Sequence, residues 1–252
     1  MTDLSGHVAL ITGGGRGIGE ATAKALAEAG ALVAVVARTS GEVERVAYAI
    51  DMAGGRAVAF AADVTDRDAM ARVCKETAGT LGPVDILINN AAVIGPLGMF
   101  SGIDTEAWAQ ACEINLIAPV QLTRALLPEM LRNGWGRVVN ITTGAVNNLT
   151  RDDTYNAYLT TKAGLEAHTL NLAAEVAHSG VTVNALRPGI VDTAMQTFIR
   201  SQDPGTIGEN FHQRFLKRYL DGDLIRPEVP ASSILELVRS RRNGEIVSTK
   251  SP

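Results

Sequence analysis

Residues 7–19 read HVALITGGGRGIG, a short apolar run that leads through a cluster of glycines into a stretch with helical periodicity. The apolar run is typical of a buried strand, and the spacing that follows it predicts a helix over Ile18–Ala29. Glycines at such a turn let the backbone approach a pyrophosphate, while the free N–H groups of the helix N-terminus supply donors and a partial positive charge. The stretch predicts a phosphate-binding loop, although a glycine-rich turn can also serve only to reverse the chain.

The same alternation of short apolar runs and helical stretches continues to the end of the chain. Strands are predicted at His7–Thr12, Ala31–Ala37, Arg56–Ala61, Asp85–Asn89, Gly136–Ile141, Val181–Leu186 and Glu245–Ser248. Further helices are predicted at Gly41–Ala53, Asp66–Leu81, Thr105–Arg132, Tyr155–His178 and Pro227–Arg239, with C-terminal stops at Gly30, Gly54, Gly134 and Gly180. The expected fold class is therefore α/β, a Rossmann-like, doubly wound parallel sheet of seven strands with helices on both faces.

Length and composition narrow the class of protein. The 252 residues are 46% hydrophobic and contain no Pro/Gly/Ser-rich linker, so we expect a single domain over residues 1–252. A net charge of -4 offers no basic surface for nucleic acid, and we interpret the run Arg239–Arg242 as the solvated end of a helix. The two cysteines and four histidines show neither a disulfide framework nor metal-ligand spacing. With no signal peptide pattern and no apolar run near the ~20 residues of a membrane span, the expected location is the cytoplasm.

The spacing of the glycines is more specific than their number. It is G-x-x-x-G-x-G after a threonine, and it resembles the T-G-x-x-x-G-I-G signature of the short-chain dehydrogenases/reductases. The resemblance continues through Asp63, the stretch Asn89–Ala92, Asn115, the Y-x-x-x-K pair Tyr158 and Lys162, and the stretch Asn184–Thr193, and it becomes weak beyond about Ala194. This similarity implies an oxidoreductase that transfers a hydride between a nicotinamide dinucleotide and a small carbonyl or secondary alcohol.

The resemblance places Tyr158 and Lys162 at the centre of catalysis. Their spacing of four puts them on one face of a helix, one turn apart. A tyrosine with an ordinary pKa near 10 is a poor base at neutral pH, so we expect the neighbouring ammonium to favour the phenolate. The phenol would act as the acid in reduction and the phenolate as the base in oxidation. Taken without its surroundings, such a pair can also be a solvated helix face.

Two further residues complete the implied catalytic set. The similarity implies that Asn115 binds a water molecule that connects Lys162 with solvent. Alternatively, its side chain serves only to break or cap its long helix through hydrogen bonds to the backbone. Thr143 falls at the position of the family serine, where its hydroxyl would bind the substrate carbonyl. It lies fifteen positions before Tyr158, which is slightly more than usual, so the loop 147–153 is extended. The alternatives are that the role belongs to Thr142 or is vacant.

The resemblance also implies a set of cofactor-binding residues. They are Thr12, Gly13, Gly15, Arg16, Gly17, Ile18, Gly19, Arg38, Asp63, Val64, Asn89, Ala91, Tyr158, Lys162, Pro188, Gly189, Val191 and Thr193. NAD-preferring members carry an Asp at the end of the second strand, where this chain has Ala37. Since Arg38 and Arg16 can flank a 2′-phosphate, NADP(H) is the expected cofactor and NAD(H) the alternative.

The remaining expectations concern the substrate and the assembly. Residues 194–226 would form the substrate lid, and His212 within it is expected at the surface. A homodimer or homotetramer is implied, with Leu165 and Leu172 on the outer faces of the pairing helices. The C-terminus lacks the V-D-G-G close of the family, which removes one tetramer contact. Two rival functions are a non-catalytic dinucleotide sensor, and an epimerase or dehydratase of the related extended group, whose chains are longer and use another glycine spacing.

Overall fold

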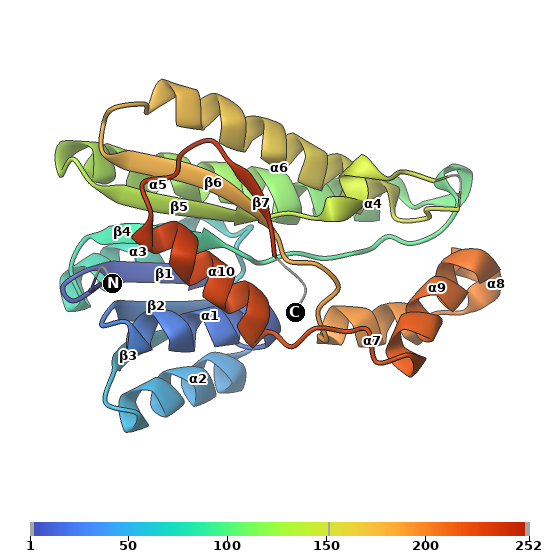
Figure 1. Cartoon of the computed structure of the whole chain (residues 1–252), viewed down its shortest axis with the longest axis horizontal. Coiled ribbons are helices and arrows are strands. Elements are labelled where there is room, and N and C mark those ends of the chain that lie inside the picture. Colours follow the sequence, from blue (N-terminus) through green and yellow to red (C-terminus); the bar gives the residue numbers. More distant parts are fainter. Residues whose placement is uncertain (1–2, 151, 250–252) are drawn as a thin grey trace.

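A central parallel sheet organises the molecule, as the computed structural model of residues 3–150 and 152–249 shows (Figure 1). Its strands are β1 Val8–Thr12, β2 Leu32–Ala37, β3 Arg56–Ala61, β4 Val84–Asn89, β5 Gly136–Ile141, β6 Val181–Arg187 and β7 Ile246–Ser248. They pair in parallel in the order β3-β2-β1-β4-β5-β6-β7. The α/β fold with a seven-stranded, all-parallel, Rossmann-like sheet is thus confirmed.

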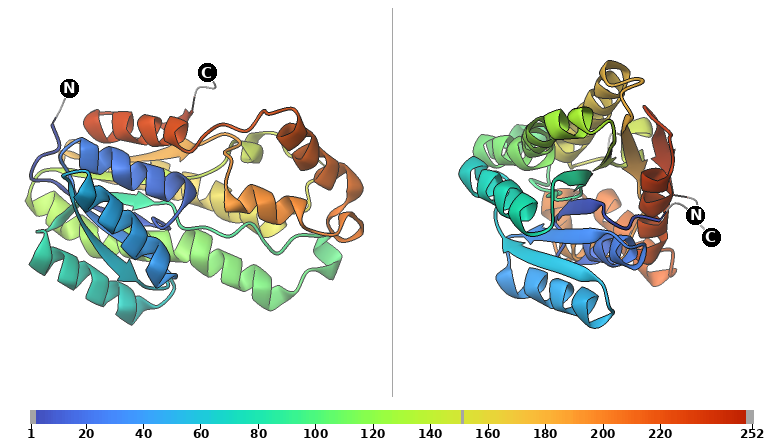
Figure 2. Two further views of the ribbon diagram at one scale, coloured as in Figure 1. Left: turned by 90° about the horizontal axis from the view of Figure 1, so that it is seen from below. Right: turned by 90° about the vertical axis from the view of Figure 1, so that its left-hand side faces the viewer.

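Helices cover both faces of the sheet (Figure 2). One apolar layer joins the sheet to α1 Gly17–Glu28, α2 Ser40–Met52 and α10 Glu228–Arg239. The opposite layer joins it to α3 Arg67–Thr80, α5 Ala118–Arg132 and α6 Asn156–Glu175. Because successive strand residues point to opposite faces, the strands feed both layers and their sequences are almost wholly apolar.

The order of the strands decides where a ligand can bind. The chain runs outward from β1 to β3, then returns across the sheet to β4 and continues to β7 on the other side. In such sheets, ligands bind outside the carboxyl ends of the strands at this reversal point, between β1 and β4. The glycine-rich loop leaves β1 at that edge, and residues 90–94 leave β4 beside it.

The predicted helix over Thr105–Arg132 is not continuous. It is divided into α4 Thr105–Cys112, a π-helical turn Glu113–Ile117, and α5. Asn115 lies within the π-helical turn, where the helix widens. The distortion expected around this asparagine is therefore present.

One helix end differs from the sequence-based expectation. Gly30, Gly54 and Gly134 directly follow the C-caps of their helices with positive φ, as predicted. The prediction for Gly180 was wrong, because α6 already ends at Glu175 and the chain then turns through His178, which has a φ of 69°. The other strand and helix ends lie within two residues of their predicted positions.

Residues 194–226 form three short helices, α7 Ala194–Arg200, α8 Pro204–Ile207 and α9 Glu209–Leu220. They lie beyond the carboxyl end of β6, to one side of the sheet (Figures 1 and 2). The expectation that His212 is a surface residue was wrong, because its ring is buried and its Nε2 lies 3.0 Å from the carbonyl oxygen of Arg200. The periodicity of α9 could not show that this face packs against α7.

The outer-face assignment of Leu165 and Leu172 was also wrong. Leu165 is fully buried, and Leu172 packs into the apolar layer beneath α6. Both side chains serve the core of this chain and give no support for a dimer. The C-terminal residues 250–252, part of the segment that lacks the usual family close, lie outside the described residues.

No helix in the described part of the chain is long and apolar enough to cross a membrane. Across residues 3–150 and 152–249, no group of three or more His, Cys, Asp or Glu side chains could hold a metal ion. Both cysteines are free thiols, in α3 and α4.

Candidate active site

The glycine-rich loop is packed so tightly that side chains are excluded from it. A Cβ on Gly19 would lie 2.2 Å from the carbonyl oxygen of Gly13, and Gly13 itself has a positive φ of 62°. The loop delivers the chain into α1, whose first turn exposes backbone N–H groups without side-chain caps. A backbone-lined turn at a helix N-terminus fits the diphosphate of a dinucleotide.

Residues after β4 fix the position of this loop. The side-chain amide of Asn90 donates to the carbonyl oxygens of Thr12 (3.0 Å) and Gly13 (3.1 Å). The hydroxyl oxygen of Thr12 in turn accepts from the backbone N–H groups of Asn90 and Ala91, each at 3.1 Å. Asn90 was not among the predicted site residues, although the N-N-A-A stretch contains it, because the sequence does not show which asparagine turns toward the loop.

The side chain of Asn89 lies in the protein interior. Its amide donates to Asn140 (2.8 Å) and to Thr123 (3.1 Å), and the residue is only 2% exposed. The structure therefore gives this side chain the task of joining β4 to β5 and α5. Val64 and Ala91 line a small cavity next to it, together with Thr12.

A carboxylate that the sequence analysis did not consider lies at the other end of the loop. Glu42, in the first turn of α2, forms an ion pair with Arg16 at 3.6 Å. A Cβ on Gly15 would meet the Glu42 side chain at 2.8 Å and the Ala37 side chain at 3.5 Å. An acidic group thus stands beside the end of β2 even though the strand itself ends in alanine.

Asp63, two residues after β3, lies close to Arg38, which directly follows β2. Partial burial opposes ionisation of the Asp63 carboxyl, but hydrogen bonds from Thr65 and the charge of Arg38 lower its pKa overall. Arg38 is exposed at the end of β2. Arg16 and Arg38 therefore both lie near the carboxyl end of β2, as a site for a 2′-phosphate would require.

Helix α6 brings the Tyr–Lys pair to the same edge of the sheet. The Lys162 ammonium lies 5.8 Å from the centre of the Tyr158 ring and donates to the carbonyl oxygen of Ile141 at the end of β5 (2.7 Å). Lys162 is 2% exposed, and its burial lowers its pKa to about 8. The side chain stays largely protonated at pH 7.

The electrostatic state of Tyr158 differs from the expected one. Desolvation of the partly buried phenol, with a smaller contribution from Tyr155, raises the pKa of Tyr158 above its ordinary value, and the nearby Thr143 hydroxyl only partly opposes this. Desolvation disfavours the charged form of each group, so it raises the pKa of Tyr158 and lowers that of Lys162. In this structure the phenol is protonated at neutral pH.

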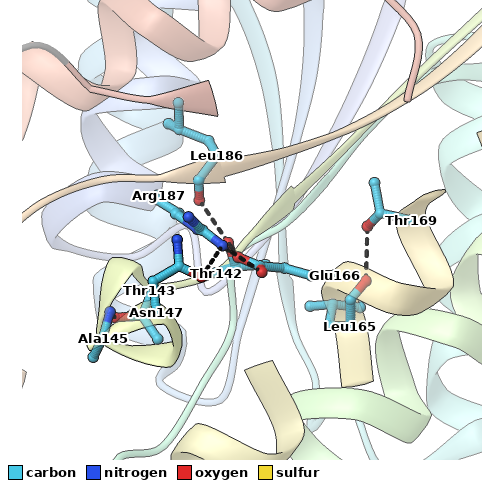
Figure 3. A network of polar contacts seen from close by, with 9 residues as sticks. All are labelled: Thr142, Thr143, Ala145, Asn147, Leu165, Glu166, Thr169, Leu186 and Arg187. Carbon is cyan, nitrogen blue, oxygen red and sulfur yellow. Dashed lines mark hydrogen bonds and ion pairs between the residues drawn. The ribbon is translucent and has the colours of Figure 1, made fainter. Parts of the chain in front are cut away.

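The two threonines after β5 point to different partners, as Figure 3 shows. Thr142 is 1% exposed, and its hydroxyl donates to the carboxylate of Glu166 at 2.9 Å. Thr143 continues in extended conformation, so its side chain turns to the other side of the chain, where its hydroxyl accepts from the backbone N–H of Ala145 (3.3 Å) and lies near enough to Tyr158 to lower the pKa of the phenol. Thr143, and not Thr142, is the threonine that the structure brings to the Tyr–Lys pair.

Asn115 joins the chain after β4 to α6 by hydrogen bonds. Its side-chain oxygen accepts from the backbone N–H of Val93 (2.8 Å), and its amide donates to the Val93 carbonyl (2.9 Å) and to the Thr161 hydroxyl (3.2 Å). The residue is fully buried. Through Thr161 it connects the π-helical turn to the residue next to Lys162, and through Val93 it holds the chain that leaves β4.

The segment after β6 closes the site against the glycine loop. The methyl group of Thr193 lies 3.2 Å from the position a Cβ on Gly17 would take, so the segment reaches the start of α1. Pro188 begins the segment directly after β6, and Gly189 has a positive φ of 79°. Val191 is buried and pairs with Ile225 in an isolated parallel bridge. The predicted residues of this stretch thus lie between the loop and the helices of 194–226.

Those helices cover Tyr158 with apolar side chains. Phe211 packs against Tyr155 in a tilted arrangement with ring centroids 4.9 Å apart, and both belong to a cluster that includes Ile94, Ile199 and Ile207. Tyr158 packs against this cluster and is partly exposed. The hydroxyl of Thr154 donates to the Ile207 carbonyl at 2.5 Å, which attaches α8 to the chain just before α6.

Comparisons with known proteins agree with this geometry. A family model described as short chain dehydrogenase matches residues 7–204. A short chain dehydrogenase of Pseudocercospora fijiensis is 37% identical, over 76% of this chain and 62% of its own length.

Two solved structures are similar over almost the whole chain. A protein assigned as an NAD(P) dependent gluconate 5-dehydrogenase from Beutenbergia cavernae, with bound NADP, is 33% identical with a TM-score of 0.84 over 98% of this chain and 96% of that one. A variant of the actinorhodin polyketide ketoreductase with NADPH is 28% identical with a TM-score of 0.86, over 98% and 96% of the two chains. This chain belongs to the short-chain dehydrogenase/reductase family, and it is an NAD(P)-dependent oxidoreductase.

Proposed function

We propose that the protein interconverts a carbonyl compound and a secondary alcohol with NADP(H), and that Tyr158 is its acid/base. The observation that carries the proposal is the Lys162 ammonium 5.8 Å from the centre of the Tyr158 ring, with Thr143, two residues after β5, on the same side of the chain as Tyr158. A protonated phenol and a hydroxyl that face the same point can bind one carbonyl oxygen. Phe211 and its neighbours pack against one side of Tyr158 and give that side of the site an apolar lining.

Each side chain has a separate task in this proposal. The bound cofactor supplies the hydride. Thr143 orients the carbonyl oxygen, and Tyr158 donates its proton to that oxygen during reduction. Lys162 holds the nicotinamide ribose and keeps a positive charge near the phenol. The protonated phenol is the form that donates a proton in reduction, and its raised pKa keeps Tyr158 in that form at neutral pH.

Lys162 makes cofactor binding pH-dependent. Its pKa of about 8 means that the ammonium is present below that pH and is lost as the pH rises above it. Since a charge-assisted hydrogen bond contributes about 1.5–3 kcal/mol, we expect the affinity for NADPH to fall by roughly tenfold or more between pH 7 and pH 10. Fluorescence titration with NADPH across this range tests the prediction. The variant Lys162→Met should bind weakly at every pH, and a constant affinity of the unaltered protein would contradict the role of Lys162.

The preference for NADP(H) is proposed from the charges around β2. Arg16 and Arg38 can donate charge-assisted hydrogen bonds to a 2′-phosphate. Glu42 opposes this preference because its carboxylate pairs with Arg16 and would repel the phosphate. Arg16 must exchange Glu42 for the phosphate, so we expect NADPH to bind about tenfold more tightly than NADH, which is the lower end of what two arginines can provide.

Substitutions at these positions should move the preference in opposite directions. Ala37→Asp with Arg38→Leu should favour NADH, because the new carboxylate accepts the ribose 2′-OH and rejects the phosphate. Glu42→Gln should strengthen NADPH binding by about tenfold, as Arg16 is released. The control is Glu44→Gln on the same helix, whose carboxylate accepts from Ser40. Titrations with both nucleotides at low salt measure the ratio, and equal affinities for NADPH and NADH in the unaltered protein would show that the arginines are ordinary surface charges.

The lid and the assembly also remain proposals. We propose that residues 194–226 close over the substrate within one domain of residues 1–252, since α8 and α9 already pack around Tyr155 beside the Tyr–Lys pair. A homodimer or homotetramer would use other residues than those first expected. Leu131 on α5 and Leu170 on α6 are 41% and 44% exposed.

A rival proposal is a sensor that binds the dinucleotide without turnover. The two functions share the glycine loop and differ at Tyr158, Thr143 and Lys162, which a sensor does not need. A screen of carbonyl compounds and alcohols with NADPH, NADP, NADH and NAD, followed by the absorbance of the reduced nicotinamide, separates them. Cofactor binding with no turnover of any compound would favour the sensor.

A further inference from the structure

A buried ion pair lies directly beside the proposed active site. The guanidinium of Arg187 donates to both carboxylate oxygens of Glu166, from Nε at 2.8 Å and from Nη2 at 2.7 Å. The two side chains are only 14% and 9% exposed. Such a two-point contact fixes the relative orientation of both groups, because the planar fork of arginine matches the carboxylate.

The pair joins three segments that end at the site (Figure 3). Glu166 lies on α6, one helical turn beyond Lys162, and accepts from the hydroxyl of Thr142 at the end of β5. Arg187 ends β6 immediately before Pro188, and it also donates to the side-chain oxygen of Asn147 (3.1 Å) in the turn that begins after Thr143.

These contacts fix the backbone next to Thr143. The backbone N–H of Thr142 donates to the Leu186 carbonyl (2.8 Å), and its side chain is held by Glu166, so the backbone is fixed immediately before Thr143. Asn147 is held by Arg187 on the other side of Thr143. Contacts to Glu166 and Arg187 thus hold the chain on both sides of Thr143, whose hydroxyl lies near the Tyr158 phenol.

Stability alone does not account for the pair. Replacing a buried ion pair by apolar side chains of similar size is often neutral for stability or even stabilising, whereas removing only one partner is strongly destabilising. An apolar pair would fill the same space between α6 and β6. It would not hold the Thr142 hydroxyl or the Asn147 side chain, which need a charged or polar partner.

We propose that Glu166 and Arg187 are positioning residues, which direct the Thr143 hydroxyl toward the carbonyl oxygen without touching substrate or cofactor. This inference rests on the proposed function, in which Thr143 binds that oxygen. It assigns a role in turnover to Glu166, which belongs to no matched motif, and to Arg187, which lies within the matched stretch Asn184–Thr193 but is not among the predicted site residues.

The test separates stability from turnover. Glu166→Leu alone and Arg187→Leu alone should each lower Tm by about 5–15 °C, since one buried charge loses its partner. The double variant with both leucines should return to within about 3 °C of the unaltered protein. Its kcat should nevertheless stay at least about tenfold lower, while the Kd for NADPH changes by less than about threefold. Recovery of both Tm and kcat would show that the pair is only structural and would overturn the proposal.

A double-mutant cycle identifies the route of the effect. If the pair acts through Thr143, then adding both leucines to Thr143→Val should lower kcat no further than about twofold. Losses that multiply would overturn the assignment. Should the double leucine variant fail to fold, Arg187→Lys decides the matter, since lysine keeps a charge for Glu166 but cannot hold Glu166 and Asn147 together. We expect about a fivefold loss of kcat for it, and an unchanged kcat would contradict the proposal.

Arg137 provides the matched control at the opposite end of β5. Its side chain is also buried, but it donates to the carbonyl oxygens of Val238, Gly136 and Gly180, far from Thr143 along the strand. Arg137→Met should lower Tm and leave the kcat of the folded protein unchanged. Absence of turnover by the unaltered protein with every carbonyl compound would mean that the proposed function fails, whereas turnover without loss in the double leucine variant would mean that only the positioning role fails.

Discussion

Tyr158→Phe should abolish turnover and leave the Kd for NADPH within a few-fold of its original value. The substitution removes the transferable proton and keeps the ring that packs against the apolar cluster around Phe211. A positioned general acid contributes about 10²–10⁴-fold to a rate, so the residual activity should lie near the limit of detection. Initial rates with a carbonyl substrate and NADPH, together with a fluorescence titration, measure both quantities.

The matched control is Tyr155→Phe. Tyr155 precedes α6, its ring centroid lies 6.0 Å from that of Tyr158, and it packs on Phe211. Loss of its hydroxyl should change kcat little, because it is not directed at the point shared by Thr143 and Tyr158. Full turnover in Tyr158→Phe would remove the tyrosine from the mechanism.

Thr143→Val should lower kcat by about 10²-fold or more. Valine keeps the shape of the side chain but removes the hydroxyl that lies near the Tyr158 phenol, and the loss of one donor to a developing oxyanion has about this effect. Thr143→Ser should retain activity because the hydroxyl remains. Steady-state kinetics of the three proteins measure the effect.

The neighbouring threonine shows how this prediction could fail. The Thr142 hydroxyl is committed to Glu166 and is buried, so it is not available to a substrate. If Thr143→Val were as active as the unaltered protein while Thr142→Val were inactive, the hydroxyl role would belong to Thr142. If neither substitution lowered kcat, the role would be vacant.

Much of the fold could be predicted because local pattern and tertiary structure agree. The strands are apolar on both faces, and the turns carry glycine where the backbone requires it, as at Gly13 and at the helix ends Gly30 and Gly54. The carboxyl ends of parallel strands share one edge, so a loop after β1 and a threonine after β5 had to meet there. Thr143 could thus be placed from its position on the strand.

Most of the wrong predictions concern helix faces, because periodicity shows that a face is apolar but does not show which element packs against it. Leu165 and Leu172 are apolar on a long helix, and only the packing against the sheet shows that they face inward. His212 was misplaced for the same reason, because the helices of 194–226 pack on one another. The pKa values of Tyr158 and Lys162 are each shifted mainly by desolvation, which a spacing of four does not reveal.

Polar partners that are distant in sequence were also missed. Glu42 reaches Arg16 from the next helix, and Glu166 reaches Arg187 across 21 positions. Neither pair has a fixed spacing or a motif. Each forms because a helix, α2 or α6, brings its glutamate next to a residue at the carboxyl-terminal edge of the sheet. Only a three-dimensional structure shows that Glu42 supplies an acidic group beside the alanine that ends β2.

Transfer of a labelled hydride tests the central proposal most directly. The protein would be incubated with NADPH that carries deuterium at C4 of the nicotinamide and with a panel of carbonyl compounds, and the products would be analysed by mass spectrometry. The proposal predicts an alcohol with deuterium on its carbinol carbon from the unaltered protein, and none from Tyr158→Phe under the same conditions. An alcohol without deuterium, or no alcohol from any carbonyl compound despite tight binding of NADPH, would contradict the assignment of this site to hydride transfer.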